Sequence, residues 1–190
     1  MTTSIPEGLS LSLNVITPEK EAEIISWLDQ QPWSTELARR TQHYGYGYNY
    51  KSKDLVPGVP LHGPILEVAN HFERTGVMKP EQCIVNEYTR NQGIAPHIDN
   101  TSFGPVVIGL SIGDENVMVF TRELPGQPME RFDCFLPRRS VVMLSGSARY
   151  EWKHSIEKKV TYIDGNGTKI SKPQDYRRIS LTYRELARPM

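Results

Sequence analysis

The most informative residues of this chain are His97 and Asp99, which stand two positions apart in the segment Gly93-Ile94-Ala95-Pro96-His97-Ile98-Asp99-Asn100. If this segment is extended, both side chains point to the same side and can reach one metal ion. A His-x-Asp pair alone is weak evidence, because a turn histidine hydrogen-bonded to a nearby aspartate gives the same pattern. Two ligands also hold a metal poorly, so a metal site requires a third.

Among the five histidines of the chain, His154 is the best candidate for the third ligand. His62 and His71 fall before and within a predicted helix, and His43 precedes a tyrosine-rich segment. His154 follows a predicted strand, and a closed β architecture would bring it beside His97. Two histidines and one carboxylate on one face of an ion leave positions open for a bidentate substrate and O2, which is typical of non-haem Fe(II) oxygenases. A structural zinc site would instead close its coordination, usually with cysteine.

A second polar group of residues occurs near the C-terminus, where residues 178–184 alternate strictly between apolar and polar. The apolar face carries Ile179, Leu181 and Tyr183, and the polar face carries Arg178, Ser180, Thr182 and Arg184. An edge strand with a solvated polar face would show the same alternation. However, this face has two arginines and no acid, and arginine binds carboxylates bidentately. The face therefore suits a dicarboxylate cosubstrate, with Asn86 and Tyr88, on one face of another predicted strand, as further polar contacts.

The elements that must position these residues change in kind along the chain. Two helices are predicted, at residues 17–30 and 63–74, with Thr17 and Pro18 at the start of the first and Gly76 closing the second. From residue 82 onward, Gly, Pro, Asn and Asp separate short β-like runs at 82–88, 106–112, 116–121, 131–136, 140–144 and 178–184. Helices followed by many short strands indicate an α+β fold with a sandwich, jelly roll or barrel.

Two stretches between these elements carry weaker signals. In residues 41–60 a period-two pattern predicts a strand or hairpin with one aromatic face, formed by Tyr44, Tyr46, Tyr48 and Tyr50. This face would either stack on a substrate base or pack over the strands. Residues 54–60 are expected to form a turn-rich loop, and the polar stretch 157–175 an exposed loop.

Composition leaves the partner open, since Lys+Arg and Asp+Glu both number 22 and the formal net charge is zero. This argues against a strongly electrostatic nucleic-acid binder, although a neutral total can hide a local basic stripe. Cys83 and Cys134 are expected to be buried free thiols, which fits a reducing compartment. No apolar run approaches the ~18 residues of a membrane span. The N-terminus does not resemble a signal peptide, so we expect a cytoplasmic protein, or also a nuclear one if the source is eukaryotic.

Taken in order, these motifs resemble the AlkB family of Fe(II)/2-oxoglutarate-dependent dioxygenases. The family pattern has an Asn-x-Tyr strand, then His-x-Asp, then a distant His, then Arg-x-Asn/Ser-x-Thr-x-Arg. Four motifs in order are far more specific than any one of them. The resemblance implies a double-stranded β-helix (jelly roll) with the N-terminal helices packed on it. It also implies one oxygenase domain over residues 1–190, with an N-terminal extension at 1–16, a substrate-recognition hairpin or lid at 31–60 and a jelly-roll core at 82–186.

The resemblance also implies roles for individual residues. His97, Asp99 and His154 would bind Fe(II), and no catalytic residue is expected beyond the metal centre. The cosubstrate 2-oxoglutarate, which reacts with O2, would be bound by Asn86, Tyr88, Arg178, Ser180, Thr182 and Arg184. Of these, Arg178 with Tyr88 would hold the distal carboxylate. Arg184, helped by Asn86 and Ser180, would contact the end that chelates iron.

Within the family, the most similar subgroup is the oxygenase module of the tRNA wobble-uridine hydroxylases, on stretches such as 93–99 and 149–154. Ser180 also resembles that subgroup, where repair members usually carry Asn. Thr101 replaces an acid that contacts the damaged base in repair members similar to the bacterial founder. The resemblance therefore implies demethylation or hydroxylation of a modified nucleobase in RNA, especially tRNA, or in single-stranded DNA.

Two other functions remain open. One is an AlkB-like oxygenase that acts on a protein or small molecule, for which the neutral charge is the main support. The other is a non-catalytic β-sandwich interaction domain. If the substrate is tRNA, we expect a protein partner or the chain's own surface to supply RNA binding, because the chain lacks the RNA-recognition and methyltransferase domains found beside the module in animals.

Overall fold

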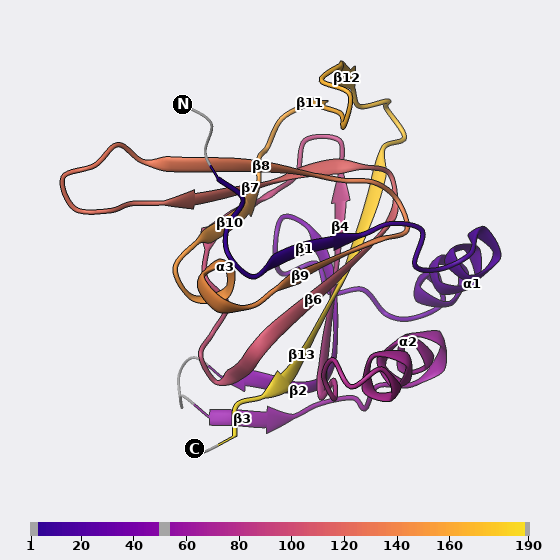
Figure 1. The fold of residues 1–190 in the computed structure, drawn as a ribbon. Coiled ribbons are helices and arrows are strands. Elements are labelled where there is room, and N and C mark those ends of the chain that lie inside the picture. Colours follow the sequence, from indigo (N-terminus) through magenta and orange to yellow (C-terminus); the bar gives the residue numbers. More distant parts are fainter. Residues whose placement is uncertain (1–3, 50–53, 189–190) are drawn as a thin grey trace.

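The structure is a computed structural model that describes residues 4–49 and 54–188 of the chain (Figure 1). Within these residues, a major sheet has the strand order β1-β9-β6-β13-β4-β2-β3 and a minor sheet the order β5-β10-β7-β8. The major sheet is built from β1 (Leu9–Ser12), β2 (Arg40–Asn49), β3 (Asp54–Pro57), β4 (Gln82–Thr89), β6 (Phe103–Gly113), β9 (Ser140–Leu144) and β13 (Arg177–Leu186). The minor sheet is built from β5 (Ile94–His97), β7 (Asn116–Arg122), β8 (Glu130–Leu136) and β10 (Lys153–Ile156). Neighbouring strands pair antiparallel, and the fold is the predicted double-stranded β-helix.

Two helices, α1 (Pro18–Asp29) and α2 (Gly63–Arg74), cover the outer face of the major sheet (Figure 1). Helix α1 begins where the side chain of Thr17 accepts a hydrogen bond from the amide of Lys20 at 3.2 Å. Helix α2 begins at Gly63, whose φ of +57° and close approach to the Trp27 ring exclude a side chain. Both helices occupy the predicted ranges, with Thr17 as the N-cap of the first.

The two faces of β13 explain the alternation seen in the sequence. This strand lies in the interior of the major sheet, between β4 and β6, and is not an edge strand. Ile179, Leu181 and Tyr183 are at most 1% exposed and pack into the core beneath the helices. The polar residues of β13 therefore point to the opposite face, into the space between the two sheets.

A second apolar core fills one end of that space. Phe120 of β7 and Trp152, which directly precedes β10, are both buried there with residues of β6, β8 and β9. The same core includes Ala148 of the short helix α3 (Gly146–Tyr150), which connects β9 to β10. Because apolar side chains fill this end, the polar residues gather at the other end of the jelly roll.

Several short strands lie where the sequence predicted none. Residues 1–16, expected to be an extension, contribute β1, which pairs with β9 at one edge of the major sheet. Strand β3 lies in the expected turn-rich loop at 54–60, and pairs with β2. The expected loop at 157–175 contains a hairpin of β11 (Thr161–Ile163) and β12 (Lys169–Ser171). These strands have three or four residues each, which is too short for a recognisable alternation.

Tyr44, which belongs to the aromatic face predicted for residues 41–60, is not available to stack on a substrate base. This side chain is 5% exposed and its ring lies 5.9 Å from that of Trp27 and 5.6 Å from that of His62. Tyr44 therefore packs under the helices, as the alternative interpretation had it. The side chains of Tyr48 and Tyr50 lie outside the part of the chain that the structure describes.

The expectation for the two cysteines is confirmed. Cys83 and Cys134 are both free and buried. Burial raises the pKa of the Cys83 thiol to about 12 and that of the Cys134 thiol to about 11, so both remain protonated thiols at neutral pH. None of the helices in the described ranges has the length and apolar character that a membrane crossing requires.

Candidate metal centre and cosubstrate site

The pairing of β5 with β10 brings the three predicted metal ligands together. In this antiparallel pair His97 lies directly opposite His154, with ring centroids 4.3 Å apart. Asp99 follows β5 by two residues, and its Oδ2 lies 3.5 Å from Nε2 of His154. One potential ligand atom from each residue lies within 4.8 Å of the others. The three side chains therefore form the compact two-histidine, one-carboxylate group expected from the sequence.

The surroundings of these side chains leave ligand atoms free. Nδ1 of His97 lies 2.8 Å from the carbonyl of Ala95, to which it donates a hydrogen bond, so that in the neutral imidazole Nε2 is the nitrogen available to a metal. The Oδ1 atom of Asp99 contacts Nη2 of Arg184, whereas Oδ2 is buried without a hydrogen-bond partner in the described structure. A buried carboxylate oxygen without a partner is costly, and a bound metal ion would supply that partner.

The charges of the site favour the protonation states that bind metals. Burial alone would raise the pKa of Asp99, but Arg184, His154 and His97 outweigh it and bring the pKa down to about 2. Burial lowers the pKa of His154 to about 4, although the charge of Asp99 opposes this change. At neutral pH the site therefore presents an ionised carboxylate and a neutral imidazole, as metal coordination requires.

The triad lies in a cavity of about 400 Å³ between the two sheets. Besides the three candidate ligands, its walls include all the residues predicted to bind the cosubstrate: Asn86, Tyr88, Arg178, Ser180, Thr182 and Arg184. Strands β4 and β13 place these residues side by side, with Ser180 opposite Asn86 and Arg178 opposite Tyr88. The structure thus brings together every residue of the predicted site.

Arg178 lies deepest in this polar wall and is only 1% exposed. Its Nη2 donates to the hydroxyl of Ser111 at 2.8 Å, its guanidinium lies 5.5 Å from the ring centroid of Tyr88, and its Nε has no partner. Among the described residues, no carboxylate forms an ion pair with Arg178. A buried guanidinium without an anion is destabilising, so these free donors are suited to a bound carboxylate.

The sequence missed other residues that support this wall. Arg184 donates from Nη1 to Oε1 of Gln82 at 2.7 Å, and Arg39 donates from Nε to Oδ1 of Asn86 at 2.7 Å. Ser111 carried a signal of its own, as a polar residue in an otherwise apolar strand. Arg39 belongs to a basic pair in the sequence, but no local pattern indicated its partner Asn86, which is 47 positions away.

Three arginines of the adjacent pairs Arg39-Arg40 and Arg138-Arg139 form internal ion pairs. Arg40 pairs with Glu87 at 2.8 Å. Arg138 and Arg139 both pair with the buried carboxylate of Glu21, at 2.9 and 3.2 Å. These guanidinium groups stabilise the fold and are poorly placed to bind phosphates.

Comparisons with known proteins agree with this geometry. The family model of the 2OG-Fe(II) oxygenase superfamily matches residues 11–184. Protein L905 of Acanthamoeba polyphaga mimivirus is 32% identical, over 94% of this chain and 85% of that protein. The tRNA (carboxymethyluridine(34)-5-O)-methyltransferase alkbh8 of Xenopus tropicalis is 28% identical over 98% of this chain, which spans only 33% of that protein. The solved structure of OsALKBH1 has the same fold, with a TM-score of 0.66, 16% identity and coverage of 96% of this chain and 98% of that chain.

The residues of the cavity fit the cofactors of this superfamily, Fe(II) with 2-oxoglutarate and O2. Two imidazoles and a carboxylate with one unpaired oxygen suit Fe(II). A buried arginine without an anion suits the distal carboxylate of 2-oxoglutarate. The chain is therefore a 2-oxoglutarate-dependent dioxygenase and belongs to the AlkB family of the 2OG-Fe(II) oxygenase superfamily.

Proposed function

We propose that this enzyme oxidatively demethylates or hydroxylates a modified nucleobase in RNA, with tRNA as the first candidate, or in single-stranded DNA. The observation that carries the proposal is one cavity that holds the metal triad, the unpaired Arg178 and, among its lining residues, Arg39. The similarity to a tRNA-modifying relative over nearly the whole chain supports the same substrate class.

In this mechanism, His97, Asp99 and His154 would hold Fe(II), which with O2 and 2-oxoglutarate would supply the oxidant for hydroxylation of a C–H bond of the substrate. Arg178, which is held by its hydrogen bond to the hydroxyl of Ser111, would orient the distal carboxylate of the cosubstrate together with Tyr88. Each turnover would convert the cosubstrate to succinate and CO2. A hydroxylated N-methyl group then releases formaldehyde and the free base, whereas a hydroxyl group on other carbons remains.

The substrate base must leave its stack to enter the cavity. Apolar side chains in the cavity wall offer it a surface: Leu37, Ile98 and Met118. Arg39 lies in the same wall and forms no ion pair with an acid in the described structure, so it is available to an anionic group of the substrate. These residues take the role that the sequence analysis considered for the tyrosine-rich segment.

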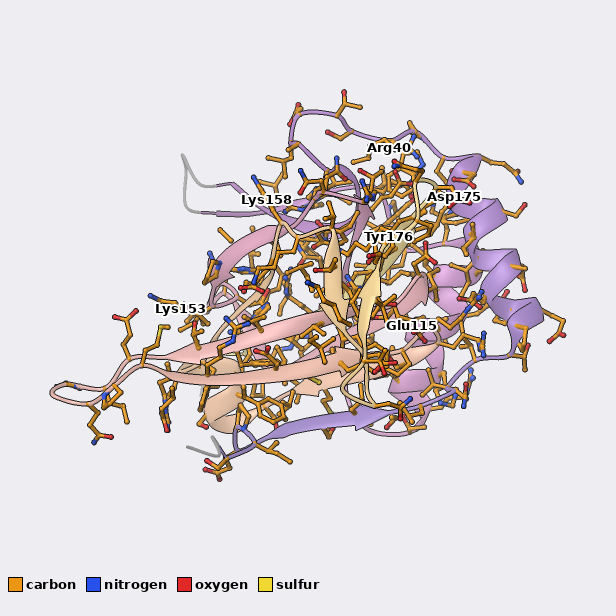
Figure 2. The ribbon with its side chains drawn as sticks, turned by 90° about the horizontal axis from the view of Figure 1, so that it is seen from above. Arg40, Glu115, Lys153, Lys158, Asp175 and Tyr176 are labelled. Carbon is orange, nitrogen blue, oxygen red and sulfur yellow. The ribbon has the colours of Figure 1, made fainter. Side chains whose placement is uncertain are left out.

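Two exposed lysines add positive charge near the strand that carries His154. Figure 2 shows Lys153 and Lys158 on the side of the molecule away from α1. Lys153 is the first residue of β10 and Lys158 follows this strand by two residues. Neither forms an ion pair with an acid in the described ranges, so both are available to phosphates.

A separate protein is proposed to supply further RNA affinity. The chain spans about a third of the tRNA-modifying relative, and its formal net charge is zero. A neutral oxygenase has little non-specific affinity for a polyanion, so a basic partner would increase occupancy. The free buried thiols fit a cytoplasmic location, or a nuclear one in a eukaryote.

The test is a substrate panel of undermodified and modified tRNA, methylated RNA and methylated single-stranded DNA. Mass spectrometry of the nucleosides and succinate release are measured for wild type, for His97→Ala and for His71→Ala, an exposed histidine of α2 that serves as the control. We expect a mass change and stimulated succinate release with wild type and His71→Ala only. Succinate formation without a mass change on any nucleic acid would point to the protein or small-molecule alternative.

A further inference from the structure

The segment that follows β5 carries Asp99, and its backbone folds around one buried guanidinium. Arg149 belongs to α3 and is 1% exposed. Its nitrogens donate to four backbone carbonyls of this segment, at 2.9, 2.9, 3.3 and 3.3 Å, which belong to Asp99, Asn100, Phe103 and Gly104. One side chain therefore bonds two carbonyls of the connection between β5 and β6 and the first two carbonyls of β6.

This use of an arginine is specific in its geometry. A guanidinium offers five N–H donors in a rigid planar fork, whereas a lysine offers three around a point charge. In the described structure Arg149 pairs with no carboxylate, so its hydrogen bonds all serve the backbone of this segment. Burial lowers the pKa of Arg149, while the negative charge of Asp99 opposes that change. The buried charge is thus compensated mainly by carbonyl dipoles.

Arginine side chains bind both the backbone carbonyl and the side-chain carboxylate of Asp99. Its carbonyl accepts a hydrogen bond from Arg149, and its carboxylate contacts Arg184 of β13. Arg149 also stands five positions before His154 in the sequence, at the end of the helix that leads into β10. It therefore links the strand that provides one ligand to the segment that provides another.

We propose that Arg149 is a positioning residue of the metal centre, which fixes the segment after β5 so that the carboxylate of Asp99 faces His97 and His154. The proposal rests on the assignment of these three residues as metal ligands. Loss of Arg149 removes a donor from four carbonyls, three of which are in buried hydrogen bonds, and the segment must rearrange or admit water. Asp99 then loses its orientation, and metal affinity falls even if the fold survives.

The experiment compares Arg149→Gln and Arg149→Lys with Arg139→Gln. The control removes a guanidinium that bonds Glu21, which is outside the cavity. For each variant we would titrate the apoprotein with Co(II), record the visible spectrum of the bound ion and measure the Tm without metal. Co(II) reports ligand geometry independently of turnover.

We expect both glutamine variants to lower the Tm, but only Arg149→Gln to weaken Co(II) binding, by about 10- to 100-fold, and to alter the Co(II) spectrum. Arg149→Lys should fall between wild type and Arg149→Gln. The proposal would be overturned if Arg149→Gln had the Co(II) affinity and the Co(II) spectrum of wild type. If Arg149→Gln does not fold, the same result in Arg149→Lys would overturn it. A wild-type protein that binds no Co(II) would instead overturn the ligand assignment, and this inference with it.

Discussion

The guanidinium of Arg184 contacts one carboxylate oxygen of Asp99, while the other oxygen faces His154. Arg184 comes from the major sheet and Asp99 follows a strand of the minor sheet, so this contact links the two sheets at the metal centre. The two carboxylate oxygens therefore have different partners: Oδ1 accepts a hydrogen bond from Arg184, and Oδ2 remains available to the metal. Arg184 therefore orients a metal ligand as well as lining the cosubstrate cavity.

Replacement of Arg184 by Gln should weaken both metal and cosubstrate binding. The carboxylate of Asp99 loses the contact that orients it, and such losses typically reduce metal affinity about tenfold or more. Titration with Co(II), followed by titration of the Co(II) protein with 2-oxoglutarate, measures both effects. Arg188→Gln is the matched control, because that guanidinium pairs with Glu81 at the surface. Unchanged binding of both ligands to Arg184→Gln would refute this role.

Replacement of Arg178 by Met should weaken the binding of 2-oxoglutarate without weakening the binding of the metal. The variant loses the buried donors for the distal carboxylate, and two charge-assisted hydrogen bonds correspond to about a 100-fold loss of 2-oxoglutarate affinity. Co(II) affinity should stay near that of wild type, because Arg178 contacts Ser111 and Tyr88 and none of the ligands. Isothermal titration under anaerobic conditions gives both constants. Equal 2-oxoglutarate affinity in wild type and variant would place the distal carboxylate elsewhere.

The same replacement of Arg178 should also change the thermal stability of the protein in the absence of cosubstrate. A buried guanidinium that lacks an anion is destabilising, and an apolar side chain of similar length removes that cost. The buried hydroxyl of Ser111 loses its partner, which offsets part of this gain. The apoprotein of Arg178→Met should therefore unfold at the same temperature as wild type or higher, as measured by circular dichroism. A clear fall in Tm would mean that Arg178 stabilises the fold even without a bound carboxylate, which contradicts the proposed role.

The parts of the site that could be predicted are those with short-range patterns. The alternation of residues 178–184 placed Arg178 and Arg184 on the polar face of β13, and the His97-x-Asp99 spacing put two ligands on one side of an extended segment. His154 was chosen by excluding the other histidines. Its position opposite His97 is confirmed, although the four-residue strand that carries it was not predicted.

The parts that could not be predicted depend on partners distant in sequence. Arg149 bonds carbonyls 45 to 50 positions upstream, and Arg39 bonds Asn86 across 47 positions. No local pattern marks a side chain whose partners are backbone carbonyls of another segment. For Tyr44 the local pattern was clear but insufficient. The alternation showed which residues share its face of the strand, but it did not show whether that face packs against the helices or lines the cavity.

Removal of the metal should lower thermal stability. A ligand that binds only the folded state stabilises it by about 2.7 kcal/mol at a concentration 100 times its Kd. For a chain of this size each kcal/mol shifts the Tm by about 2–4 °C, so Co(II) should raise the Tm by about 5–10 °C and EDTA should reverse this. His154→Ala is the control that should show no response to either reagent. A similar Co(II) response in that variant would contradict the role of His154.

The buried carboxylate of Glu21 predicts a pH dependence of stability that is unrelated to the metal. Glu21 of α1 is 1% exposed and accepts hydrogen bonds from the amide of Gly113 at 2.9 Å, from Arg138 at 2.9 Å and from Arg139 at 3.2 Å. Burial alone would raise its pKa, but these donors prevail and bring the pKa below its ordinary value of 4.5. A depressed folded-state pKa stabilises the protein above the unfolded-state value and loses this contribution as the pH falls through the folded-state value.

Glu21→Gln should therefore lower the free energy of unfolding at pH 7, by about 1–3 kcal/mol, and the difference from wild type should shrink as the pH falls below 4.5. Glu23→Gln is the control, because Glu23 is exposed and pairs only with Lys20 in the described structure, so its effect should be near zero at every pH. Urea unfolding curves for the three proteins at several pH values from neutral to acidic measure the difference directly. A constant difference between Glu21→Gln and wild type across that range would show that the carboxylate stabilises the fold by packing and not by its charge.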